Sequence, residues 1–109
     1  MFVEQDYVLV YVTCGDQQEA GAIARQLVEG RLAACCNILP GMQSVYRWEG
    51  KTEEATEVLL LAKTRAALVE AIVQKVQDLH SYDCPCVTAL PLTGGAASFL
   101  QWIDEQTRA

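Results

Sequence analysis

Apolar residues fall into two patterns along the chain, and these patterns predict its secondary structure. Tyr7 to Cys14 and Cys86 to Leu92 are nearly continuous apolar runs, which are typical of strands buried on both faces. Between Asp16 and Gly30, and again from Thr64 to Leu79, apolar residues recur at helical spacing, which predicts two capped helices with one buried face. A last helical pattern includes Phe99 to Ile103.

The middle of the chain is predicted to form one long β-hairpin. Its strands are Leu32 to Trp48, interrupted at Pro40-Gly41, and about Glu54 to Lys63. The turn Glu49-Gly50-Lys51 joins them, and its glycine supplies the positive φ that a tight turn requires. The returning run of residues 52–63 spans roughly 40 Å at about 3.3 Å per residue. A compact chain of this size is roughly 34 Å across, so we expect the hairpin to project beyond its own domain.

The order of these elements predicts the fold class. A single domain, 1–109, with the order βαββαβ and an extra C-terminal helix matches the ferredoxin-like α+β fold. Two helices would cover one face of its sheet, yet three of the four strands are apolar at both alternating positions. An exposed apolar face of several hundred Å² would cost several kcal/mol at about 25 cal/mol per Å². We therefore expect the terminal helix and other subunits to cover that face.

Charge and composition exclude several classes of partner. Eight basic and fourteen acidic residues give a net charge of −6, without a basic stripe, so nucleic acid is not an expected partner. No apolar run approaches the roughly 20 residues that a membrane span needs. The start, Met1 to Asp6, has no signal-peptide core. These observations predict a cytoplasmic protein without a membrane association.

Several stretches of the chain resemble the CutA family of divalent-cation tolerance proteins. The matching stretches are Arg31 to Cys35, Asn37 to Gly41, Ser44 to Lys51, Lys63-Thr64, Ala89 to Pro91 and Phe99 to Ile103. The resemblance covers about Val8 to Arg108, and its Tyr46 to Lys51 segment is highly specific. It implies a ferredoxin-like fold and a homotrimer similar in architecture to the PII signalling proteins. It also implies a link to tolerance of copper or another divalent metal, and no firmly attached enzymatic reaction.

Metal binding is open to two interpretations. The copper ligands that the resemblance implies would occupy the positions of Val12, Leu79 and His80, so this chain retains only the histidine. Cys84 and Cys86 are two residues apart, and in an extended segment their side chains would point to the same side. Thiolates with an imidazole suit Cu(I) or Zn(II), which predicts a site of His80, Cys84 and Cys86. The alternative is a surface histidine, a loop cysteine and a small buried strand cysteine.

The hairpin carries the other candidate site. Tyr46, Arg47 and Trp48 are predicted to anchor the trimer interface, because these residue types dominate interface energetics; a ligand platform is the alternative. Cys14 is either a buried structural cysteine or a thiol activated by the following helix, which Asp16 and Glu19 are predicted to cap.

The sequence leaves two functions open. The first is a CutA-like homotrimer that binds metal ions. The second is a PII-like signalling module that binds a small metabolite or a protein partner between its subunits. An enzyme is not expected, because no base stands at a recognisable spacing from a cysteine.

Overall fold

The protein forms one four-stranded antiparallel sheet with three α-helices. The computed structural model describes residues 7–108, and its strands lie in the order β2-β3-β1-β4. The elements are β1 (Tyr7–Cys14), α1 (Gln17–Glu29), β2 (Cys35–Trp48), β3 (Lys51–Arg65), η1 (Ala66–Leu68), α2 (Val69–Leu79), β4 (Val87–Pro91) and α3 (Ala97–Gln106). This is the predicted ferredoxin-like arrangement with a C-terminal helix. In the described part of the chain, no helix combines the length and the apolar character that a membrane span requires.

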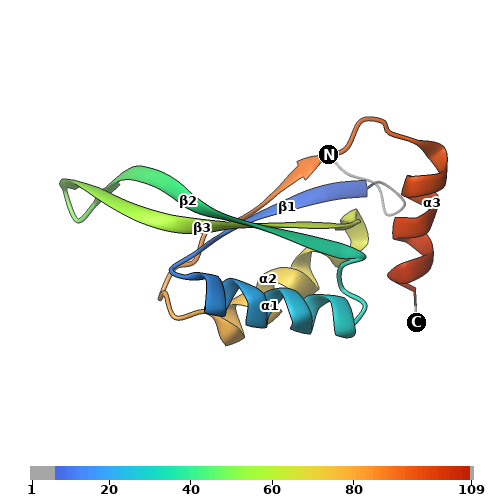
Figure 1. Ribbon diagram of the computed structural model, residues 1–109, viewed down its shortest axis with the longest axis horizontal. Helices are drawn as coiled ribbons and strands as arrows, with labels where there is room; N and C mark the ends of the chain where they lie inside the picture. Colours follow the sequence, from blue (N-terminus) through green and yellow to red (C-terminus); the bar gives the residue numbers. More distant parts are fainter. Residues whose placement is uncertain (1–6, 109) are drawn as a thin grey trace.

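The hydrophobic core lies between one face of the sheet and the pair α1 and α2 (Figure 1). Alternate residues of β1 point into it and are completely buried: Val8, Val10, Val12 and Cys14. The antiparallel register places Leu60 and Ala62 of β3 opposite Val12 and Val10, so both strands present the same face to the helices. Burial of each large aliphatic side chain contributes about 1.5–3 kcal/mol, which fixes the sheet against the helices.

The opposite face of the sheet is only partly covered. The half-buried residues of its central strands are Leu9, Tyr11, Leu59 and Leu61. Helix α3 stands at one end of the sheet and buries Ile103 completely (Figure 1). Its C-terminus is held by Arg65, whose Nε donates to Thr107 Oγ1 at 2.9 Å. The terminal helix therefore covers one end of this face, and the remainder stays open in the single chain.

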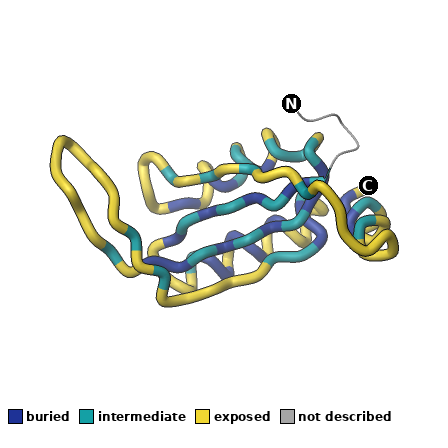
Figure 2. The backbone as a smooth tube through the Cα atoms, turned by 90° about the horizontal axis from the view of Figure 1, so that it is seen from above, coloured by how far each residue is buried: buried dark blue, intermediate teal, exposed yellow. Residues whose placement is uncertain are grey.

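Strands β2 and β3 form the predicted projecting hairpin. The molecule measures 43 × 27 × 23 Å, and the hairpin extends beyond the helices along the longest axis (Figure 1). The register shifts between Leu39 and Met42, at the predicted interruption, where Gly41 has φ 81°. At the tip, Glu49 and Gly50 both have positive φ, 50° and 79°. Residues on both strands of the tip are exposed (Figure 2).

The start of α2 differs from the prediction. Thr64 does not cap a helix; it lies in β3, is completely buried, and its Oγ1 donates to the carbonyl oxygen of Leu32 at 2.6 Å. Strand β3 continues to Arg65 because Tyr7 of β1 is paired with it. The helix therefore begins later, at Val69, after the short turn η1.

The two ends of α1 follow the prediction more closely. Asp16 is the N-cap, and its carboxylate accepts from the backbone N–H of Glu19 at 2.8 Å. Gly30 is the C-cap, but its φ is −81°, and the following Arg31 adopts the positive φ of 58°. The backbone N–H of Leu32 then donates to Leu27 at the helix end, so β2 begins at Cys35 rather than at Leu32.

Candidate functional site

The structure does not gather the three metal ligands predicted from the sequence. His80 is buried with 9% exposure, whereas Cys84 and Cys86 are exposed. Residues 81–84 bend, so the segment is not the extended strand on which the prediction depended. The alternative interpretation is also wrong for His80, which is not a surface histidine, and for Cys86, which is exposed and precedes β4.

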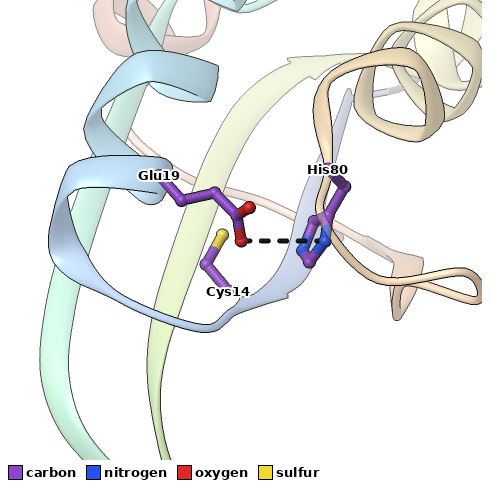
Figure 3. A group of neighbouring side chains, drawn as sticks. All are labelled: Cys14, Glu19 and His80. Atoms are coloured by element: carbon purple, nitrogen blue, oxygen red, sulfur yellow. Dashed lines mark ion pairs between the residues drawn. The ribbon is translucent and has the colours of Figure 1, made fainter.

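The structure instead brings His80 together with Cys14 and Glu19 (Figure 3). Cys14 ends β1, Glu19 lies in the first turn of α1, and His80 directly follows α2. The sulfur, one carboxylate oxygen and one ring nitrogen all lie within 4.8 Å of one another. Among residues 7–108 this is the one group of three or more potential metal ligands. The sequence did not indicate this group, because Glu19 was assigned to the cap of a helix. His80 is 61 residues further along the chain, and only the fold brings it beside Glu19.

Both ring nitrogens of His80 have hydrogen-bond partners. Nε2 lies 2.7 Å from the carbonyl oxygen of Thr13, and because a carbonyl only accepts, Nε2 is the donor. Nδ1 accepts from the backbone N–H of Tyr82 at 3.0 Å and lies 3.7 Å from Glu19 Oε1. The neutral imidazole satisfies both hydrogen bonds. A metal ion would bind at Nδ1 and would displace the N–H of Tyr82.

The Glu19 carboxylate connects α1 to two loops. Oε1 accepts from the backbone N–H of Gly15 at 3.3 Å, and Oε2 accepts from the backbone N–H of Ser81 at 3.0 Å. Burial raises the pKa of Glu19, but the hydrogen bonds from Ser81 and Gly15, together with nearby His80, outweigh it and leave the pKa below its ordinary value. Glu19 is therefore negatively charged at neutral pH.

The Cys14 thiol is protonated at neutral pH. Its burial, together with the charges of Glu19, Asp16 and Glu57, raises the pKa of Cys14 to about 11. The start of α1 does not produce an activated thiol, because burial and the nearby carboxylates both raise the pKa. This favours a structural thiol over an activated one. A bound metal ion would favour the thiolate over the thiol, because a coordinating thiol loses its proton.

The donor set of this group fits a divalent ion of borderline softness. Zn²⁺ binds sulfur at about 2.3 Å and nitrogen or oxygen at about 2.0–2.2 Å in a tetrahedron, so its ligand atoms lie roughly 3.3–3.8 Å apart. The 3.7 Å between His80 Nδ1 and Glu19 Oε1 is slightly longer than the roughly 3.3–3.6 Å that a nitrogen and an oxygen ligand would have. With all atoms within 4.8 Å, the thiolate of Cys14 would need to approach by up to about 1 Å.

A cavity of about 450 Å³ adjoins the same loop. Its lining residues come from β1, the hairpin and residues 82–86: Thr13, Ser44, Tyr46, Trp48, Glu57, Tyr82, Cys84 and Cys86. The structure thus places the predicted interface aromatics and the predicted cysteine ligands around one space. Arg47 is not among the lining residues; its guanidinium donates to the carbonyl oxygen of Gly50 at 3.3 Å.

Fold and site together define a ferredoxin-like protein with a projecting hairpin and a group of side chains that could hold a metal ion. The chain belongs to the CutA1 divalent ion tolerance protein family, whose model matches residues 8–106. It is 45% identical over 101 residues to the chloroplastic protein CutA of Arabidopsis thaliana, covering 93% of this chain and 56% of that protein. The chain thus spans little more than half the length of this relative.

Solved structures of the family share the fold throughout. The crystal structure of CutA1 from Oryza sativa superposes with a TM-score of 0.91 at 42% identity and covers 94% of both chains. The structure of the periplasmic divalent cation tolerance protein CutA from Archaeoglobus fulgidus has a TM-score of 0.91 at 41% identity, over 94% of this chain and 99% of that one.

The names of these relatives correct the prediction of a cytoplasmic protein. The Arabidopsis relative is named chloroplastic, and the Archaeoglobus structure is described as periplasmic. The prediction was based on composition and on the first six residues, which lie outside the described part of the chain. Neither feature specifies a compartment when close relatives occupy different ones.

Proposed function

We propose that this protein binds a divalent metal ion through Cys14, Glu19 and His80 as part of a role in metal tolerance. The observation that carries the proposal is the convergence of three different ligand atoms within 4.8 Å from three separate segments. Imidazole, thiolate and carboxylate together suit Zn²⁺ or a copper ion. The naming of the Archaeoglobus relative as a divalent-cation tolerance protein supports a metal-linked role.

Metal binding would change the loop that follows α2. The N–H of Tyr82 occupies His80 Nδ1, and the N–H of Ser81 occupies Glu19 Oε2. His80 Nδ1 would become a metal ligand, so Tyr82 would lose its hydrogen bond, and movement of the Glu19 carboxylate to bind the ion through Oε1 would weaken the hydrogen bond from Ser81. The loop carries Tyr82 and Cys84 into the wall of the adjoining cavity. Occupancy of the metal site would thereby alter a surface that a partner or ligand can detect.

We propose further that the protein functions as a homotrimer. The sheet face opposite α1 and α2 is open beyond α3, and the projecting hairpin exposes Tyr46 at 44% and Trp48 at 53%. A closed ring of three heterologous contacts would let each hairpin lie on a neighbour. It would also satisfy edge hydrogen-bonding groups that otherwise promote aggregation. Tyr46, Arg47 and Trp48 remain the predicted anchors of this contact.

Calorimetric titration of the reduced protein with Zn²⁺ tests the metal site without oxidising its thiols. Cys14→Ser should abolish tight binding, because a serine hydroxyl is a poor ligand for this ion. Cys36→Ser is the matched control: Cys36 is a half-buried thiol, whose pKa burial raises to about 12, but it lies outside the ligand group. Unchanged binding by Cys14→Ser, with loss in a Cys84→Ser/Cys86→Ser variant, would refute the proposed site and support the cysteine pair.

A second function is supported by the cavity between the hairpin and the loop. A PII-like signalling module would bind a small metabolite there, close to the proposed contacts between subunits. The cavity volume of about 450 Å³ lies within the roughly 300–1,000 Å³ typical of small-molecule sites. Binding of a metabolite by metal-free protein would favour this function over the first.

A further inference from the structure

The cavity contains a carboxylate that is almost completely buried. Glu57 has 7% exposure and lies on the open face of β3, at the base of the hairpin. The phenol of Tyr82 donates to its Oε2 at 2.7 Å. No ion pair to Glu57 is found among residues 7–108. A carboxylate with so little exposure ordinarily has a cationic partner, because burial of a charge is costly.

Aromatic rings form the walls around this carboxylate. Tyr46 and Trp48 come from β2, and Tyr82 comes from the loop after α2. The faces of aromatic rings carry partial negative charge and attract cations, and tryptophan does so most strongly. The rest of the lining consists of Thr13, Ser44, Cys84 and Cys86. The lining includes no lysine or arginine, so no cationic side chain among the lining residues neutralises Glu57.

The charge at the cavity is negative. The phenol of Tyr82 is a neutral donor, so its hydrogen bond leaves Glu57 without a cationic partner among residues 7–108. The chain as a whole carries a net charge of −6, which also favours the approach of a positive ligand.

We propose that this cavity binds a small organic cation, with a primary ammonium group against Glu57 and its carbon chain against Tyr46 and Trp48. An organic cation fits better than a hard metal ion, because Ca²⁺ and Mg²⁺ require several oxygen ligands and the lining here offers a single carboxylate. It also fits better than a soft metal ion, because no second group of three metal ligands exists among the described residues. The inference deepens the second function proposed above and does not require a bound metal ion.

Three ligands of the same length test the proposal on metal-free protein: n-butylammonium, 1-butanol and butyrate. Trp102→Phe leaves Trp48 as the sole tryptophan, so its fluorescence reports on the cavity directly. n-Butylammonium should bind saturably and change the Trp48 emission, whereas the neutral and anionic analogues should not. Equal binding of all three, or none by n-butylammonium, would overturn the proposal. This comparison of three ligands does not require a substitution of Glu57. It therefore tests the proposal even where a Glu57 variant fails to fold.

Glu57→Gln tests the role of the carboxylate. It should weaken n-butylammonium binding by roughly tenfold or more, because hydrogen bonds to a charged group are stronger than those to a neutral one. Glu54→Gln is the matched control, since Glu54 is exposed and lies on the opposite face of β3. Equal affinity of the two variants would contradict the proposal. Zn²⁺ calorimetry on the same samples reports separately on the metal site, so failure of one site is distinguishable from failure of the other.

Discussion

His80 is the residue at which the proposed metal site and the cavity meet. Its Nδ1 faces Glu19 and accepts from the backbone of Tyr82, whose side chain reaches Glu57 in the cavity wall. The rings of His80 and Tyr82 are also in contact, with centroids 4.6 Å apart. A ligand that displaces Tyr82 from His80 therefore changes the position of a residue that holds the buried carboxylate. This short chain of contacts gives a physical route between the two sites.

The five cysteines should differ strongly in their reaction with iodoacetamide. Cys84 and Cys86 are exposed and should react quickly, whereas Cys14 should react slowly because it is completely buried and its pKa is about 11. Mass spectrometry of labelled peptides from metal-free protein measures each rate, with denatured protein as the control. Labelling of Cys14 as fast as Cys84 would show that the thiol is neither buried nor protonated.

Glu19 should contribute stability that depends on pH. Because its pKa is lower in the folded protein, the contribution is present above its unfolded pKa of about 4.3 and is lost as pH falls through the folded value. Glu19→Gln should therefore lower the free energy of unfolding by about 1 kcal/mol at neutral pH, through weaker hydrogen bonds to Gly15 and Ser81. Urea unfolding of metal-free protein at several pH values gives the difference.

Two outcomes decide the role of Glu19. The difference between wild type and Glu19→Gln should shrink as the pH falls below the unfolded pKa, and it should vanish once the pH passes the lower pKa of the folded protein. A difference that stays constant down to acid pH would mean that the charge of Glu19 does not stabilise the fold.

The sequence could predict the residue types of a metal site but not their grouping. Cys84 and Cys86 suggested a site because they are close in sequence, yet the bend at residues 81–84 separates their environment from that of buried His80. The sequence assigned Cys14 to a strand end, as a structural or activated thiol, and Glu19 to a helix cap. Their convergence with His80 arises because β1 and α2 end, and α1 begins, in the same part of the fold, which no local spacing encodes.

At the scale of secondary structure, the sequence was informative because apolar periodicity decides which face is buried. The projecting hairpin, the bulge near Gly41 and the turn at Gly50 were all predictable from strand length and glycine positions. The end of β3 was not. Thr64 has the chemistry of a helix cap, but the pairing of Tyr7 with Arg65 extends the strand past it. Tertiary pairing overrides a local capping preference in such cases.

The hairpin turn contains a strained residue that can be improved. Glu49 has φ 50°, a conformation that costs a non-glycine residue roughly 1 kcal/mol and that asparagine tolerates better. Glu49→Asn should therefore raise the free energy of unfolding by about 0.5 kcal/mol, while Gly50→Ala, at φ 79°, should lower it by about 1 kcal/mol. Thermal unfolding measures both. A stabilising Gly50→Ala would show that the turn adopts another geometry.

At the scale of the whole molecule, the shape of the chain favours association. The longest dimension of 43 Å exceeds the others because the hairpin extends past the helices, and the sheet face beyond α3 is uncovered (Figure 1). Exposed Leu39, Leu90 and Trp48 are distributed over this face and the hairpin. A single chain would expose this apolar surface to water, whereas three chains in a ring would cover it.

Trp48 should be an anchor of the trimer. Trp48→Ala should cost about 2 kcal/mol or more at each contact, as removal of interface aromatics commonly does. Sedimentation equilibrium at micromolar concentration should give three times the 12.0 kDa chain mass for the wild type and a lower average mass for the variant. Val45→Ala, on the opposite face of β2, is the control. A wild-type mass of one or two chains would rule out the trimer.

The most direct test of the proposed metal site is X-ray absorption at the zinc edge of the reduced, Zn²⁺-loaded protein. A site of Cys14, Glu19 and His80 predicts one sulfur at about 2.3 Å, with nitrogen and oxygen ligands at about 2.0–2.2 Å. Two sulfur ligands would place the ion at Cys84 and Cys86 instead, and a shell without sulfur would exclude Cys14. Either result would contradict metal binding by Cys14, Glu19 and His80.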